Sequence, residues 1–140
     1  MISIKETGRP RVDVPGFSSA QMGQIGQLSL DEEQARLAQA VNVQDQPSRP
    51  LKPSYALQKE KAGLHPVRDL RFTGEMLTAR QVSQAEDNSV TIGFADPLQE
   101  KKAQRNEQIE PMLGVSPANK SVLDEHVQAT FSDNVKKLNG

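Results

Sequence analysis

The sequence predicts an α+β fold with three to four helices and a small antiparallel β-sheet. Apolar residues recur every three to four positions over residues 117–138, which predicts a long C-terminal helix. Apolar and polar residues alternate on both sides of "EDNS", which predicts a β-hairpin over residues 80–95. Hydrophobic residues make up only 35% of the 140 residues and aromatic residues 4%. The core is therefore expected to be thin and mainly aliphatic.

The first 28 residues are predicted to form an extended N-terminal arm, and residues 29–140 a single α+β domain. "MISI" alternates and is compatible with one short strand. Residues 7–27 are rich in Gly, Pro, Ser and Gln and have no sustained period, which is typical of a weakly ordered segment. Removing the residues before Gln27 is expected to weaken assembly and to leave a folded domain. Apolar side chains suited to anchoring the arm on a neighbouring subunit are Val12, Val14, Phe17, Met22 and Ile25.

Two helices are predicted after the arm. Ser29 and Glu32 have the spacing of a capping box, which predicts a helix over residues 30–41. After a proline-rich loop, Ser54 is expected to cap a shorter helix that stops at Gly63.

A short helix is predicted directly before the hairpin. Thr73 is expected to cap one helical turn over "GEMLTA", in which Leu77 lies on the apolar side. Gly74 is expected to allow close backbone approach where this turn meets the hairpin.

The C-terminal part contains two further helix starts. Asp96 and Pro97 form the first, but "DPLQEKKAQRNEQIEP" is so polar that an exposed helix and a flexible rim segment both remain open. Ser116 and Pro117 form the second, at the beginning of the long helix. One face of that helix is predicted to be buried, and it carries Leu123, Val127 and Phe131.

The charge is nearly balanced overall and uneven locally. The formal net charge is -1, but seven Lys or Arg face three Asp or Glu between residues 49 and 80. An ordinary solvated surface would explain this excess, and so would a surface for acidic partners. The clustered basic and aromatic residues of a nucleic-acid reader are absent from the sequence.

The sequence contains no residue constellation for catalysis, so we expect no enzymatic activity, no cofactor and no metal. The chain has no cysteine, which excludes disulfides and thiol chemistry. His65 and His126 lie far apart in the sequence, and the carboxylate pairs are adjacent residues rather than groups across a cleft. Nucleotide-binding and hydrolase motifs are absent. Neither a signal peptide nor a membrane-spanning run is present, so we expect no membrane association.

The segment "LKPSYALQKEKAGLHPVRDLRFTGEMLTARQVSQAEDNSVTIGF" resembles the phage virion-morphogenesis, or tail-completion, family. The family pattern is a proline-bearing helix start, a Lys-rich helix, a Leu-x-x-Thr-Gly-x-Leu element and a hairpin. In this chain that element reads as Leu70 with Thr73, Gly74 and Leu77. "EPMLGVSPANKSVLDEHV" is similar to the family's closing pattern of a proline, a short apolar-Gly-apolar-Ser link and a last helix. The resemblance covers about the last two-thirds of the chain. Residues 7–27 match no part of the pattern, and the segment after Phe94 lacks the aromatic, His- and Gly-bearing stretch of many relatives.

The resemblance implies a structural subunit of the head–tail neck, assembled in the host cytoplasm and resident in the virion. Such a subunit forms a homo-oligomeric ring, six-fold or twelve-fold, through which DNA passes without sequence-specific binding. Its partners are adjacent neck, connector or tail-terminator proteins, toward which the basic excess is expected to face. A non-virion assembly adaptor or chaperone is the alternative. The candidate fold and interface residues are Thr73, Gly74, Leu77, Leu123, Val127 and Phe131.

Overall fold

The computed structural model describes residues 3–4, 16–71 and 74–139 of the chain. The described part is an α+β fold, as predicted. It has five helices rather than three or four, because both the single turn before the hairpin and the polar segment after it are helical. In chain order, the elements are β1 (Ser3–Ile4), α1 (Ser19–Ala38), α2 (Pro53–Lys61), α3 (Glu75–Thr78), β2 (Arg80–Glu86), β3 (Ser89–Phe94), α4 (Pro97–Ile109) and α5 (Pro117–Asn139).

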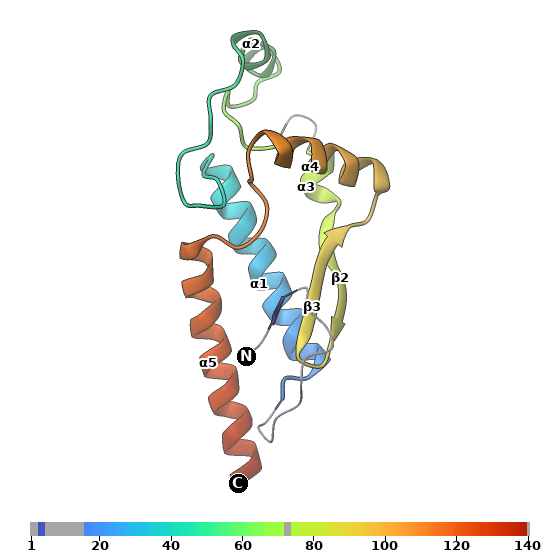
Figure 1. Cartoon of the computed structure of the whole chain (residues 1–140), viewed down its shortest axis with the longest axis vertical. Coiled ribbons are helices and arrows are strands. Elements are labelled where there is room, and N and C mark those ends of the chain that lie inside the picture. Colours follow the sequence, from blue (N-terminus) through green and yellow to red (C-terminus); the bar gives the residue numbers. More distant parts are fainter. Residues whose placement is uncertain (1–2, 5–15, 72–73, 140) are drawn as a thin grey trace.

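Helix α1 lies in the middle of the molecule, with the hairpin on one side and α5 on the other (Figure 1). The predicted antiparallel hairpin of β2 and β3 is confirmed, with a bulge between Val82 and Gln84. The two-residue β1 adds to β3 in parallel. Gly26 makes the close contact between α1 and the hairpin possible, because a Cβ atom there would lie 2.7 Å from a methyl carbon of Val90.

The predicted boundary of the N-terminal arm is wrong, because residues 19–28 belong to α1. The helix begins after Ser18, whose hydroxyl accepts a hydrogen bond from the Gln21 backbone N–H while the Gln21 side chain accepts one from the Ser18 N–H. Ser29, the expected cap, is buried inside the helix. Burial against the hairpin and α5 outweighs the low helix propensity of the glycines in this stretch. The part of the arm at residues 5–15 lies outside the described residues.

Among the described residues, two apolar clusters form the core. The larger lies where α1, the hairpin and α5 meet, and the smaller lies at the other end of α1. The larger cluster comprises Phe17, Met22, Ile25, Val90 and Leu123. The smaller comprises Leu37, Leu77 and Met112.

A buried polar network lies on α1 between these clusters. Glu33 accepts two hydrogen bonds from the Arg80 guanidinium, at 2.9 and 3.0 Å, and a third from the Gly114 backbone N–H at 2.7 Å. Arg36 donates to the Asn119 side chain and to the carbonyls of Val41 and Gly114. These contacts fix the link between α4 and α5 against α1.

The long C-terminal helix is confirmed, but its predicted buried face is only partly buried. Leu123 is 4% exposed and Val127 packs against the larger cluster. Phe131 is 36% exposed, so the prediction that it belongs to the core is wrong. At about 100° per residue, Phe131 lies roughly 80° around the helix axis from Leu123. Asn134 lies closer to the buried direction and bonds the Gly16 carbonyl and the Gln21 side chain.

Candidate functional site

Helix α2 projects from the rest of the molecule (Figure 1). Its contact with the other helices and strands is at most marginal. Two of its apolar side chains are exposed, Tyr55 by 40% and Leu57 by 50%. The predicted cap at Ser54 is wrong: the helix begins at Pro53, and Lys52 occupies the N-cap position without a side-chain hydrogen bond. The left-handed Gly63, with φ of 77°, follows its end.

A buried ion pair fixes α2 to the connector that follows it. Lys59 is 1% exposed, and its ammonium lies 2.6 Å from a carboxylate oxygen of Asp69 and 2.7 Å from the Val67 carbonyl. The same Asp69 oxygen accepts a hydrogen bond from the Arg71 N–H. Because both charged groups are paired, the burial of Lys59 and Asp69 is compensated.

Glu110 attaches both ends of this projection to the body of the molecule. Its carboxylate accepts hydrogen bonds from the Arg49 backbone N–H, at 2.9 Å, and from the Asn42 side chain, at 3.1 Å. The Arg68 guanidinium lies 3.6 Å from the same carboxylate. Residues 49–71, hereafter the α2 module, are therefore held by charged and polar contacts.

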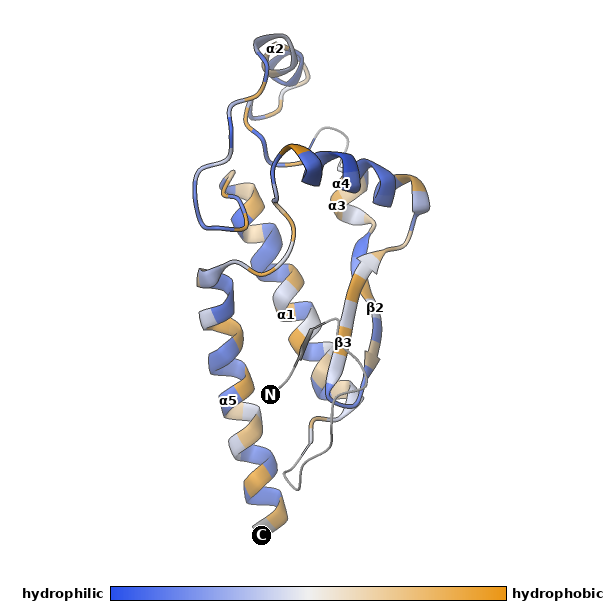
Figure 2. Ribbon diagram, viewed as in Figure 1, coloured by the Kyte–Doolittle hydropathy of each residue, from blue (hydrophilic) through white to orange (hydrophobic). Residues whose placement is uncertain are grey.

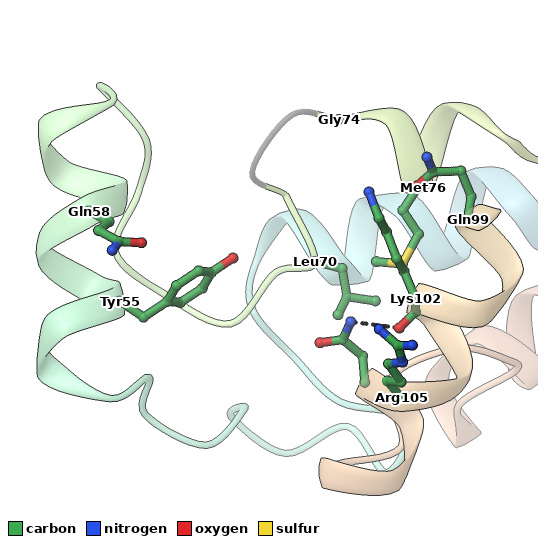
Figure 3. A pocket seen from close by; sticks show the side chains of 9 residues that line it. Tyr55, Gln58, Leu70, Gly74, Met76, Gln99, Lys102 and Arg105 are labelled. Carbon is green, nitrogen blue, oxygen red and sulfur yellow. Dashed lines mark hydrogen bonds between the residues drawn. The ribbon is translucent and has the colours of Figure 1, made fainter.

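A groove of about 410 Å³ separates α2 from α4. In Figure 3, Tyr55 and Gln58 come from α2 on one side, and Gln99, Lys102 and Arg105 come from α4 on the other. The lining residues are Tyr55, Gln58, Leu70, Gly74, Met76, Gln99, Lys102, Arg105 and Asn106.

The groove combines an apolar patch with positive charge. Tyr55, Leu70 and Met76 supply the apolar and aromatic surface, whereas Lys102 and Arg105 supply the charges. No carboxylate is among the described lining residues. Glu75 lies in the adjacent shallow hollow, where it accepts a hydrogen bond from the Gln99 side chain at 3.3 Å.

The fold and interface candidates predicted just before the hairpin, Gly74 and Leu77, lie in and beside α3. Thr73 is outside the described residues. Gly74, rather than Thr73, is the N-cap of α3 and lines the groove. The close approach predicted for Gly74 is wrong, because a Cβ atom there would meet no atom of the described residues within 4 Å, apart from its chain neighbours. Its φ of 83° is what favours glycine. Leu77 is buried in the smaller cluster beside Leu37.

The structure does not bring all predicted candidates together. Leu123, Val127 and Phe131 lie on α5, whereas Gly74 and Leu77 lie in and beside α3. Sequence reasoning missed Tyr55, Lys102 and Arg105. The three-residue spacing of Lys102 and Arg105 indicates a shared helix face, and Figure 2 shows α4 as mostly hydrophilic. Their position opposite α2 depends on tertiary contacts that no local pattern encodes.

The described residues contain no group of three or more His, Cys, Asp or Glu side chains placed to hold a metal ion. His65 lies exposed in the connector after α2, and His126 lies half-buried on α5. No helix in the described ranges has the length and apolarity needed to cross a membrane.

No family model, curated protein or solved structure matches this chain. Function is therefore inferred from its residues and their geometry.

Proposed function

We propose that this protein is a structural subunit of the phage head–tail neck. In this role it completes the tail or joins it to the head, and it assembles as a homo-oligomeric ring around the DNA channel. The observation that carries the proposal is the projecting α2 module, with Tyr55 and Leu57 exposed on a helix that ion pairs hold away from the body. Exposed apolar side chains on a projecting, fixed helix favour burial against another chain.

The order of the elements also supports this proposal. The sequence resemblance to tail-completion proteins runs through a Lys-rich helix, a Thr-Gly turn, a hairpin and a Ser-capped last helix. Helices α2 and α3, the β2–β3 hairpin and α5 follow each other in that order. The predicted Ser116 cap is confirmed, since its hydroxyl accepts a hydrogen bond from the Asn119 N–H.

The basic segment is proposed to face neighbouring neck, connector or tail-terminator proteins. Three of its seven cations already have acidic partners within the chain: Lys59, Arg68 and Arg80. Of the other four, Arg49, Lys52 and Lys61 are exposed and Arg71 is half-buried. A few exposed cations suit surface pairing with acidic rims, and DNA would pass through the channel without sequence-specific contact.

A non-virion assembly adaptor or chaperone is the second candidate. The open groove between α2 and α4 favours it, because a groove of this kind fits a segment of a client protein as well as one of an adjacent neck protein. Purified particles distinguish the two roles. A neck subunit is present in them at a fixed number of copies, whereas an adaptor is absent.

Native mass spectrometry and quantification of the protein in purified particles test the proposal. We expect a closed oligomer of six or twelve copies and a fixed number of copies in each particle. Replacing the exposed apolar pair Tyr55 and Leu57 by serine should shift the oligomer to monomers. Val122→Ser on α5, also at an exposed apolar position, is the control and should leave the oligomer intact. A protein that is monomeric at all concentrations and absent from particles would refute the neck assignment.

A further inference from the structure

We propose that the groove between α2 and α4 binds an acidic segment of a partner protein and takes up one apolar side chain of that segment. The inference rests on the proposed function only in making the partner another protein of the assembly. It goes further in assigning the contact to one groove and in stating the chemistry of the occupant.

The shape of the groove favours an inserted side chain. Met76 is 8% exposed and forms part of the floor, Leu70 is half-buried in the connector, and Tyr55 stands on the opposite wall (Figure 3). This apolar patch is bordered by the amide side chains of Gln58 and Asn106. An apolar anchor surrounded by hydrogen-bonding groups is the usual composition of a peptide-binding groove.

The charge of the groove favours an acidic occupant. Lys102 and Arg105 lie one turn apart on the exposed side of α4, and neither forms an ion pair in the part of the chain that the structure describes. Outside the lining, exposed Lys101 lies next to exposed Glu100 on α4, and exposed Lys52 lies at the start of α2. A segment with carboxylates on both sides of its apolar anchor would complement this arrangement.

Nucleic acid fits the groove less well than a peptide does. Affinity for nucleic acid comes from many phosphate contacts, and each one requires a cation. Here two cations border an apolar patch.

A second copy of this chain also fits less well. Its exposed acidic residues in the described ranges are spread over α1, α2, α3, the hairpin tip, α4 and α5, and several already have partners. Leu98 is exposed between Asp96 and Glu100, but the Asp96 carboxylate is engaged in capping α4. Asp87 accepts a hydrogen bond from the Ser19 N–H, and Asp124 pairs with Lys120. The hairpin tip also lacks a large exposed apolar side chain among the described residues.

Peptide selection on the intact chain tests the inference. Random twelve-residue peptides would be displayed and selected for binding to the full-length protein. The selected peptides would be synthesised, and their affinity would be measured by fluorescence anisotropy. We expect enrichment of peptides with several Asp or Glu around one Leu, Ile or Phe. Reversing both groove charges, with Lys102→Glu and Arg105→Glu, should weaken binding about tenfold or more, the sum of two surface pairs. Added salt should weaken binding to the unmodified chain.

The matched control reverses two exposed lysines at the end of α5, with Lys136→Glu and Lys137→Glu, and should leave peptide affinity unchanged. Circular dichroism checks that both variants are folded. Peptides without acidic residues, or equal binding to the two variants, would overturn the proposal. So would displacement of the peptide by a 20-base-pair DNA duplex at physiological salt, or by an excess of unlabelled chain. The oligomer measurement is independent, so monomers that still bind the acidic peptide would refute the ring and leave the groove assignment standing.

Discussion

Glu33 and Arg80 form a two-point ion pair in the interior, and the Arg80 guanidinium also lies over the Phe94 ring, 5.1 Å from its centroid. Such a pair adds little net stability compared with an apolar replacement, because both charges lose their hydration. The geometry of this ion pair nevertheless restricts how the segments around it can be placed. Glu33 orients β2 through Arg80 and the α4–α5 link through Gly114, so one side chain fixes the relative position of three segments.

Alanine substitutions on α5 should separate its buried face from its exposed flank. Leu123→Ala removes a side chain that is 4% exposed in the larger cluster, and we expect a loss of about 2–5 kcal/mol in the free energy of unfolding. Phe131→Ala removes a side chain that is 36% exposed, and the loss should be about 1 kcal/mol. Urea unfolding measures both. Equal losses would show that Phe131 is buried in solution, for example against a second subunit.

Asp45 connects the loop after α1 to the start of α5. Its carboxylate accepts a hydrogen bond from the Ala118 backbone N–H at 2.7 Å. This bond lowers the pKa of Asp45, with further lowering by the Ser116 hydroxyl and by the charge of Arg36. Because the pKa is lower in the folded state, the carboxylate stabilises the fold above the unfolded pKa of about 3.9. That contribution is lost as the pH falls through the lower folded value.

The variant Asp45→Asn should therefore be less stable than the unmodified chain near neutral pH. Asn tolerates the left-handed conformation of this residue, with φ of 61°, so the backbone remains comparable. We expect the difference in melting temperature to shrink as the pH is lowered from about 5 to about 3. Thermal unfolding followed by circular dichroism measures it. A difference that stays constant across this range would mean that the ionised carboxylate contributes nothing.

At the scale of elements, the sequence predicted those helix starts and strands that depend on residues close together in the chain. Asp96 caps α4 as expected, by accepting a hydrogen bond from the Leu98 N–H, and the alternation on both sides of "EDNS" became β2 and β3. The first half of α1 was missed because its glycines lower helix propensity, whereas the burial of Met22 and Ile25 comes from distant segments. The groove was missed for the same reason, since its two walls are α2 and α4.

Breaking the Lys59–Asp69 ion pair should loosen the α2 module without unfolding the rest of the molecule. Lys59→Met leaves the Asp69 carboxylate buried without its cation, a change that costs about 3–5 kcal/mol where a buried pair is broken. Because α2 makes little contact with other elements, the cost should appear as local opening. Hydrogen exchange should then accelerate in α2 and stay unchanged in α1.

Lys61→Met, at an exposed position of the same helix, is the control and should leave exchange in α2 unchanged. Faster exchange in α1 and the hairpin together with α2 would instead show that the module unfolds only with the whole molecule.

At the scale of the whole molecule, residues 1–15 and residues 16–26 contribute differently to the stability of the fold. Deleting residues 1–15 removes β1 but leaves every described member of the larger cluster in place, so the domain should fold. Deleting residues 1–26 removes Phe17, Met22 and Ile25, each worth about 2–5 kcal/mol. That loss is comparable with the roughly 5–15 kcal/mol of a typical domain, so the shorter chain should be unfolded.

Circular dichroism and thermal melting of the two truncated chains measure this difference. A cooperative melt of the chain without residues 1–26 would contradict the central place of α1 and restore the extended-arm interpretation.

The central position of α1 also determines when the molecule can fold during synthesis. This helix leaves the ribosome before its partners, the hairpin and α5. The Gln21 side chain bonds Asn134, which lies 113 positions later in the chain. At about 5–20 residues per second, α1 waits several seconds with its apolar face unpaired. Local contacts are too few to hold a Gly-containing helix alone, so stable structure should appear only when α5 has emerged. Folding of this domain is therefore expected to follow the synthesis of α5 rather than to proceed helix by helix.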